Sequence, residues 1–204
     1  MSGSSSLRER KKQKTRWLIQ EHALRLFREQ GYEQTTVDQI AAAAEISPST
    51  FFRYFKTKED VVLEDEYDPM LLAGLAAAPA EMAPVPAMRY AMRQAFGQID
   101  QTELPRLLER TRLTLSVPAL RMRTLDNFTG QFELLGGPLA ARYGRSTRDF
   151  DIRVLVGAIF GAIFAAVLTW VERDGGDDLM TLMDDALAQI ESAGLATADA
   201  PAAP

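Results

Sequence analysis

The chain has 204 residues, of which 47% are hydrophobic and 25% charged, so it is long enough for one or two ordinary globular domains. It contains no cysteine and a single histidine, His22, which excludes disulfides, thiolate metal sites, cysteine nucleophiles and multi-histidine metal centres. Most familiar catalytic chemistry is thereby missing, and we expect a protein that is not an enzyme and holds no cofactor or metal.

The charge is unevenly distributed along the chain. Residues 1–58 carry 11 Lys and Arg against 6 Asp and Glu, whereas residues 59–204 carry 12 against 22, and all five lysines lie in the first segment. A formal net charge of −5 would by itself argue against a nucleic-acid partner. The division instead predicts a basic N-terminal module joined to an acidic body.

A long charged helix is predicted from Leu7 to Gln30. Its apolar residues recur at helical spacing, and Gly31 then ends it as a C-terminal cap. Residues 1–8 lack the apolar segment of a secretory signal, so we expect a flexible lead. The basic residues that open this helix are candidate DNA contacts, in particular Arg10 and Lys14.

Two short helices follow, each with a recognisable start. Thr36-Val37-Asp38-Gln39 reads as a capping box, in which Thr36 bonds the amide three residues on and Gln39 reaches back. After a turn at Glu45-Ile46, Ser47 is a good N-cap and Pro48 occupies the first helical position. The third helix is therefore expected from Ser47 to Tyr54 or Phe55.

This arrangement predicts a helix-turn-helix DNA-binding unit. Small polar groups at the start of the third helix can reach base edges, and helix N-termini favour phosphate. Phe51 and Phe55 are expected to pack inward on Ile40 and Phe27. The candidate DNA-binding residues of this segment are Thr35, Thr36, Ser47, Pro48, Ser49, Thr50, Phe52, Arg53, Tyr54 and Lys58, with Thr57 preceding the fourth helix.

The run TTVDQIAAAAEISPSTFFRYFKTKEDVV, from Thr35 to Val62, resembles the N-terminal signature of TetR-type bacterial regulators. The resemblance covers roughly Arg10 to Glu66. It implies phosphate contacts from Thr35, Thr36, Tyr54 and Lys58, and base contacts from Ser49, Thr50 and Arg53. The C-terminal half is loosely similar to actinobacterial regulators of the mycofactocin-associated kind.

Two residues depart from the family pattern. Phe52 stands where the family usually has Tyr, so it lacks a phosphate-bonding hydroxyl and offers apolar contact. Glu45 stands where the family usually has Gly, and a left-handed conformation there would cost Glu about 1 kcal/mol.

The acidic body is also predicted to be helical, without strands. A fourth helix should run from near Lys58 to near Tyr67, and residues 78–86 (APAEMAPVP) read as a proline-rich loop. Gly136-Gly137-Pro138 should break or kink one of the later helices. Those later helices are expected at Ala87–Ile99, Glu103–Ser116, Pro118–Leu135, Phe150–Arg173 and Asp178–Ser192, before a disordered tail at Leu195–Pro204.

The segment from Val154 to Val171 has 18 residues without a charge, the lower limit for a membrane-spanning helix. We favour a buried helix shared between a core and a subunit interface, because a helix apolar on all sides must be covered. A second copy of the chain would supply that cover, and the TetR resemblance implies an interface built from the last two helices. The expected interface residues are Gly157, Phe160, Gly161, Phe164, Leu168, Met183 and Leu187.

The remaining helices would enclose an effector cavity in TetR-like proteins. Apolar and thioether side chains suit an apolar ligand, and the many arginines could admit an anionic headgroup such as that of a fatty acid or an acyl-CoA. The candidate ligand-binding residues are Met70, Met92, Phe96, Arg110, Met122, Phe128, Phe132 and Phe164.

The sequence thus predicts an all-α protein with a three-helix helix-turn-helix domain at residues 9–58 and a helical effector-binding and dimerisation domain at residues 59–194. The expected function is a cytoplasmic bacterial repressor that binds a palindromic DNA operator as a homodimer and is released by a small apolar or amphipathic molecule. One alternative is a DNA-binding regulator without a small-molecule effector, controlled by a protein partner. Another is an enzyme or a membrane-anchored protein, and the only feature that favours it is the apolar segment from Val154 to Val171.

Overall fold

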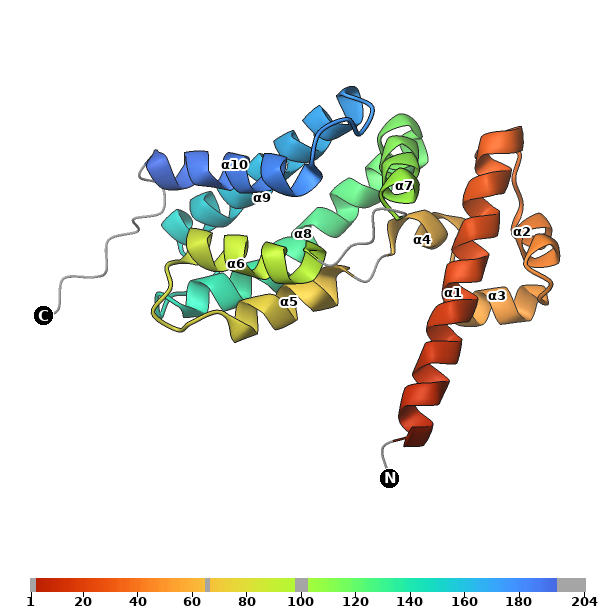
Figure 1. Ribbon diagram of the computed structural model, residues 1–204, viewed down its shortest axis with the longest axis horizontal. Coiled ribbons are helices and arrows are strands. Elements are labelled where there is room, and N and C mark those ends of the chain that lie inside the picture. Colours follow the sequence, from red (N-terminus) through yellow and green to blue (C-terminus); the bar gives the residue numbers. More distant parts are fainter. Residues whose placement is uncertain (1–2, 65–66, 98–102, 194–204) are drawn as a thin grey trace, which may run out of the picture. The chain divides into compact units, whose positions relative to one another are not determined.

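The computed structural model describes residues 3–64, 67–97 and 103–193, with side chains except those of residues 3–10, 67–68, 127–129 and 131. Within these ranges the secondary structure is helical and contains no strand, which confirms the predicted all-α class (Figure 1). The helices are α1 (Gly3–Gln30), α2 (Val37–Ala43), α3 (Pro48–Tyr54), α4 (Lys58–Leu63), α5 (Tyr67–Ala77), α6 (Pro84–Phe96), α7 (Leu104–Ser116), α8 (Pro118–Ala141), α9 (Phe150–Glu172) and α10 (Leu179–Ser192).

The helices form two compact units. The first, here called the head unit, comprises the chain up to Glu64 together with Glu109–Thr124; the second, the body unit, comprises Asp65–Leu108 and the chain from Leu125 onward. The border therefore differs from the expected one near residue 58. Val61, Val62 and Leu120 are buried in the same core as the first helices, so α4 and the α7–α8 connection belong to the head unit.

The head unit is built around a small core of large side chains. In Figure 1, α2 and α3 lie beside α1, and the pairs α1 with α2, α1 with α4 and α2 with α3 are in contact. Phe51 and Phe55 are fully buried in one cluster with Ile40 and Phe27, as predicted. Helix α1 already begins at Gly3, inside the segment that was expected to be a flexible lead.

Three helix boundaries differ from those predicted. Helix α4 ends at Leu63, well before Tyr67, and α6 begins at Pro84, inside the expected loop, because the first turn of a helix accepts proline. Of the break or kink expected at Gly136-Gly137-Pro138, the break is absent, since α8 continues to Ala141 with Pro138 inside it. Tertiary packing offsets the weak local propensity there: Leu135 and Leu139 flank this segment and are buried in the body core.

The body unit has a core of aliphatic and thioether side chains around one tryptophan, Trp170. Met88, Leu139, Ile159 and Leu187 are fully buried with it. Helices α5 and α6 pack very closely: a Cβ atom added at Gly74 would lie 2.7 Å from the Cα atom of Ala91. Only glycine permits this approach, so a residue that is a poor helix former is required by the packing.

Helix α9 buries one face and leaves the other uncovered. Ile152, Leu155, Val156, Ile159, Ala166 and Trp170 point into the body core. The opposite face is apolar as well, and Phe164 is 53% exposed. In the part of the chain that the structure describes, α9 alone is long and apolar enough to cross a membrane by length and composition. Its inner face nevertheless belongs to an ordinary globular core.

Arginines link the helices of the body unit. Arg89 on α6 makes a bidentate ion pair with Asp184 on α10, with N···O distances of 2.9 and 2.7 Å, and also contacts Glu191. The hydrogen bonds from Arg89 hold the pKa of the Asp184 carboxyl below its usual range. Arg142 donates to the carbonyl oxygens of Leu75 and Ala78 at the end of α5, which satisfies groups that the helix leaves without partners.

Candidate nucleic-acid interface

The start of α3 is fixed by its cap. The Ser47 Oγ atom accepts a hydrogen bond from the Thr50 amide at 3.1 Å and lies 2.8 and 2.9 Å from the hydroxyls of Ser49 and Thr50. Pro48 occupies the first turn, as predicted. The predicted capping box of α2 is also present, since Thr36 Oγ1 accepts from the Gln39 amide and Gln39 accepts from the Thr36 amide. Both helices of the motif therefore begin where their own side chains place them.

The turn between α2 and α3 contains a left-handed residue, at the position where the TetR pattern usually has glycine. Glu45 has φ of +54°, and the amide of Ile46 donates to the Ala41 carbonyl at 2.9 Å. Gly31, at the end of α1, likewise has φ of +87°. The family pattern of glycine in the turn thus reflects a backbone conformation that this chain keeps with Glu.

Helix α3 has a buried face and an outward face. Phe51 is fully buried, whereas Pro48, Ser49 and Arg53 are exposed and Phe52 is 53% exposed. Thr50 and Tyr54 are half-buried at the border. The Arg53 guanidinium lies 5.4 Å from the centre of the Tyr54 ring. The outward face therefore collects the residues predicted to read DNA, and the buried face holds the helix in place.

Thr35 differs from the prediction. It is 1% exposed, its hydroxyl donates to the Gly31 carbonyl at 2.8 Å and accepts from Gln30 Nε2 at 3.1 Å. The Thr35 hydroxyl thus holds the loop between α1 and α2, and its side chain is not available for the expected phosphate contact. Thr36, one residue on, remains exposed at the N-terminus of α2.

Lys58 combines a structural contact with its place at the start of α4. Its Nζ atom donates to the carbonyls of Tyr32 and Thr35, at 2.8 and 3.1 Å, and lies 4.1 Å from the centre of the Tyr32 ring. The Tyr32 hydroxyl donates to Glu59 at 2.9 Å. Burial, reinforced by this bond, raises the pKa of the Tyr32 hydroxyl. The ammonium group therefore joins the α1–α2 loop to α4.

Burial alone would raise the pKa of the Glu59 carboxyl. Hydrogen bonds from its own backbone amide, Tyr32 and Thr57, together with the charge of Lys58, outweigh burial and hold the pKa below its usual range. Thr57 also caps α4 by accepting from the Asp60 amide at 3.2 Å. The N-terminus of α4 is thus charged, capped and rigidly connected to the loop before α2.

Of the two basic residues of α1 predicted to contact DNA, Lys14 has an exposed side chain. The side chain of Arg10, the other predicted contact on this helix, lies outside the described residues.

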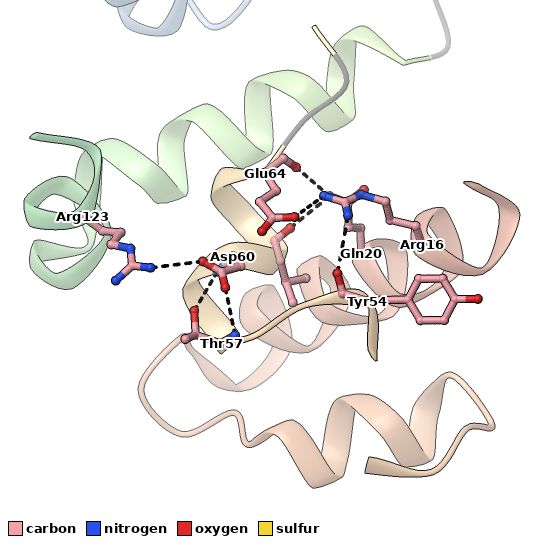
Figure 2. Close-up of polar contacts among 8 residues, drawn as sticks. Arg16, Gln20, Tyr54, Thr57, Asp60, Glu64 and Arg123 are labelled. Atoms are coloured by element: carbon pink, nitrogen blue, oxygen red, sulfur yellow. Dashed lines mark hydrogen bonds and ion pairs between the residues drawn. The ribbon is translucent and has the colours of Figure 1, made fainter. Parts of the chain in front are cut away.

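Two residues of α1 that the sequence did not single out hold the motif together. Arg16 contacts Glu64 at 2.5 Å and the Tyr54 carbonyl at 3.5 Å, and Gln20 donates to the carbonyls of Val61 and Glu64 (Figure 2). A signal was present in the sequence: Arg16 lies one turn before Ile19 on the helix face that carries the apolar stripe. A charged residue on that face requires a charged or hydrogen-bonding partner.

The connection between α7 and α8 is a second part of the head unit that sequence reasoning missed. Leu120 is fully buried in its core, with Leu113 and Val117 packed against the same cluster. Arg123 lies 3.6 Å from the carboxylate of Asp60 on α4 (Figure 2). Because α8 continues to Ala141, one helix contributes to the cores of both units.

The residues predicted to bind a ligand fall into several places. Met92 is buried in the body core, and Phe96 and Phe132 pack against it. The rings of Phe132 and Phe160 are stacked, with centroids 6.2 Å apart. The others are not gathered there: Met70 and Phe164 are exposed on α5 and α9, Arg110 and Met122 lie in the head unit, and the Phe128 side chain is outside the described residues.

The predicted interface residues separate by exposure. Gly157, Gly161, Phe164 and Leu168 are half-buried or exposed on the outer face of α9, whereas Phe160 packs against the body core. Met183 and Leu187 are buried inside the body unit itself. These two side chains of α10 are therefore not presented to a second chain, because the apolar stripe of α10 faces its own core.

A basic module with a capped helix-turn-helix, joined to a second helical unit, is the arrangement of a DNA-binding regulator. Comparison with known families agrees with this class. Residues 19–64 match the model of the tetR family of bacterial regulatory proteins, and residues 82–195 match the model of the MftR C-terminal domain. The chain belongs to the TetR family of transcriptional regulators.

Individual relatives are also regulators. The HTH-type transcriptional regulator TcmR of Streptomyces glaucescens is 38% identical over 82% of this chain and 76% of its own length. The mycofactocin biosynthesis regulator MftR of Mycobacterium tuberculosis is 28% identical over 76% of this chain and 79% of its own length. The fatty acid degradation regulator FadR of Bacillus halodurans has the same fold, with a TM-score of 0.61 and 23% identity, covering 90% of this chain and 95% of that one.

Proposed function

We propose that this TetR-family regulator is a cytoplasmic repressor that binds a palindromic operator as a homodimer and leaves it when a small apolar or amphipathic molecule binds the body unit. The outward face of α3 carries the proposal. It presents Ser49, Arg53 and the half-buried Thr50 beside a capped N-terminus, while Phe51 anchors the opposite face. Small polar groups at this place can enter the major groove and reach base edges.

Affinity and specificity are divided between two sets of residues in this proposal. Ser49, Thr50 and Arg53 read bases, and the exposed Phe52 adds apolar contact. Thr36 and Lys58, at the starts of α2 and α4, together with Tyr54, hold phosphates. Their effects on binding should differ in kind, because phosphate contacts carry no sequence information directly.

The outer face of α9 supports dimerisation. Gly157, Gly161, Phe164 and Leu168 recur at steps of four and three, so they share one helix face. A Cβ atom added at either glycine would meet nothing within 4 Å, which leaves room for close approach of another helix. An apolar face of this length is disfavoured in water, and a second copy of the chain would cover it and pair two heads.

The aromatic side chains around the body core support an apolar effector. Phe96, Phe132 and Phe160, from three different helices, pack against the core without being fully buried. Leu107 and Leu108 of α7 do the same, and α7 has no fully buried residue. An apolar molecule placed among these side chains would complete their burial, with about 25 cal/mol gained per Å² of apolar surface removed from water.

Selection of preferred sequences from a random DNA pool, at stated salt concentration, tests the DNA-binding proposal. Thr50→Ala should relax the preference at one position of each half-site, whereas Lys58→Ala should lower affinity evenly across sequences. A wild-type protein without a preferred sequence would exclude the repressor. A changed base preference in Lys58→Ala would refute the division into reading and phosphate-binding residues.

Sedimentation velocity tests the dimer. The wild-type protein should sediment as a dimer, and Phe164→Arg should sediment as a monomer, because a charge would be placed in the apolar interface. Leu134→Arg is the matched control, since Leu134 is an apolar residue 43% exposed on a different helix, α8. A Phe164→Arg variant that stays dimeric would place the interface elsewhere.

Release of labelled operator DNA tests the effector class. Saturated fatty acids and their CoA thioesters are the probes, with unacylated CoA as the control for the anionic group alone. Phe132→Ala should reduce release without changing DNA affinity, and Leu134→Ala, two residues along α8, should behave as wild type. If no apolar or amphipathic probe releases the DNA, control by a protein partner becomes the better proposal.

A further inference from the structure

Arg16 occupies a junction between three helices of the head unit. It extends from α1, and its terminal nitrogens contact Glu64 at the end of α4 and the Tyr54 carbonyl at the end of α3 (Figure 2). Its guanidinium carbon lies 4.5 Å from the centre of the Phe55 ring. The Arg16 side chain is only 18% exposed. Three kinds of contact thus converge on one partly buried guanidinium.

The side chains of Arg16 and Gln20 donate hydrogen bonds to carbonyl groups that the short helices α3 and α4 leave without partners. Helix α3 has seven residues and α4 has six, and the last carbonyls of each have no partner within their own helix. Arg16 supplies a donor to the end of α3, and Gln20, one turn further along α1, supplies donors to the Val61 and Glu64 carbonyls. Phe55, where α3 ends, is extended and fully buried beneath the Arg16 guanidinium.

We propose that Arg16 is a positioning residue for DNA recognition, whose guanidinium, paired with Glu64 and stacked on Phe55, sets the orientation of the reading helix α3 against α1. The inference rests on the proposed DNA-binding function and assigns to Arg16 no contact with DNA. Only arginine has the planar group that can stack on a ring and reach two acceptors at once. Lysine would keep the charge and lose this geometry.

A direct phosphate contact is the competing role, and it differs in two measurable ways. A residue that neutralises a phosphate contributes nearly one unit to the slope of log affinity against log salt concentration. It also contributes equally to specific and non-specific DNA. A positioning residue leaves the salt slope unchanged and affects the preferred sequence far more than scrambled DNA.

Glu64 offers a second test, because the proposal predicts a change in DNA affinity opposite to the one expected from its charge alone. Removal of an acidic charge from a DNA-binding unit normally strengthens binding to DNA. If Glu64 acts by holding Arg16, Glu64→Gln should instead weaken binding to the preferred sequence. Glu21→Gln is the matched control, because Glu21 is exposed on the same helix as Arg16 and the charge change is identical.

The experiment measures affinity for the sequence selected by the wild-type protein and for scrambled DNA, over a range of salt, with Arg16→Ala, Arg16→Lys, Glu64→Gln and Glu21→Gln. Arg16→Ala removes the charge, so it tests the salt slope, and Arg16→Lys keeps the charge and tests the geometry. Arg16→Lys and Glu64→Gln should each weaken specific binding about tenfold, the effect of about one charge-assisted hydrogen bond. Non-specific affinity and the salt slope should stay as in wild type, and Glu21→Gln should bind at least as tightly. Measurements below the unfolding transition of each variant keep folding separate from recognition.

The possible outcomes distinguish this inference from the function on which it rests. A wild-type protein without sequence preference would overturn both. A wild type that prefers one sequence, with Arg16→Lys and Glu64→Gln binding that sequence equally well, would overturn the role of Arg16 alone. A reduced salt slope in Arg16→Ala, with equal losses on both DNAs, would make Arg16 a phosphate contact.

Discussion

The head unit and the body unit are stabilised in different ways. In the head unit, α2, α3 and α4 each start at a side chain that accepts a backbone hydrogen bond, and the core contains Phe51 and Phe55. In the body unit, α6 and α9 have no side-chain cap. Helix α6 is held by close packing against Gly74 of α5 and by the ion pair of Arg89 with Asp184 of α10, and α9 by burial of its inner face, including Trp170.

The difference follows from helix length and from task. A helix of six or seven residues gains little from its own hydrogen bonds, so its ends must be fixed by caps and by neighbours such as Arg16. Longer helices depend less on their ends, so α6 and α9 are held without a side-chain cap, although Asp178 does cap α10. Caps and neighbouring side chains therefore hold α3, whereas the body unit has half-buried aromatic rings and an apolar α9 face, on which the proposed effector site and dimer interface rest.

The largest expected effect is a loss of unfolding free energy when the core of the head unit is disturbed. Phe51→Ala should cost about 3–5 kcal/mol of unfolding free energy, because a fully buried ring is lost from a small cluster. Amide hydrogen exchange should show loss of protection in α2 and α3 and little change in the body unit. Phe52→Ala is the control, since Phe52 is 53% exposed and should change stability little. Equal loss of amide protection in both units would mean that the two units unfold together.

A smaller loss of unfolding free energy is expected when the close packing of α5 against α6 in the body unit is disturbed. Gly74→Ala should destabilise by about 1–3 kcal/mol although alanine is the better helix former, because its Cβ atom would overlap the Ala91 backbone. Gly130→Ala on α8 is the matched control, with nothing within 4 Å of its added Cβ atom, and should be neutral or stabilising. Urea unfolding followed by Trp170 fluorescence in a Trp17→Phe background reports on this unit. A stabilising Gly74→Ala would show that α5 and α6 can move apart.

The Arg89–Asp184 pair should make the body sensitive to acid. The pKa of Asp184 is lowered in the folded protein, so its stabilising contribution is complete above the unfolded value of about 3.9 and is lost as the pH falls through the folded value. The same fluorescence measurement at about pH 7 and about pH 3 should show that the difference between wild type and Asp184→Asn shrinks in acid. A constant difference would argue against the ion pair as its source.

The smallest expected effect concerns the turn of the motif. Glu45→Gly should stabilise the head unit by up to about 1 kcal/mol, because glycine adopts the left-handed conformation without the cost that a side chain imposes. Thermal unfolding would detect it, with Glu33→Gly as a control for loss of the charge. A destabilised Glu45→Gly would indicate that the Glu45 side chain contributes contacts that outweigh its backbone strain.

Sequence reasoning was accurate where short-range chemistry determines structure. The cap at Ser47 and the capping box at Thr36 depend on neighbouring residues only, and each was predicted in place. It was inaccurate at Thr35, whose burial depends on how the α1–α2 loop meets Gln30 and Gly31. It also missed Arg16, because the partner Glu64 is 48 residues away along the chain.

The sequence by itself determined the all-α class, the position of the helix-turn-helix and the family, because these are encoded in periodicity, caps and a motif of local spacing. The tertiary structure alone decided that α8 passes through Gly136-Gly137-Pro138 and that Glu109–Thr124 belongs to the head unit. It also decided that Met183 and Leu187 face inward. Such features depend on which apolar surfaces meet, and burial between distant segments outweighs local propensity whenever the two disagree.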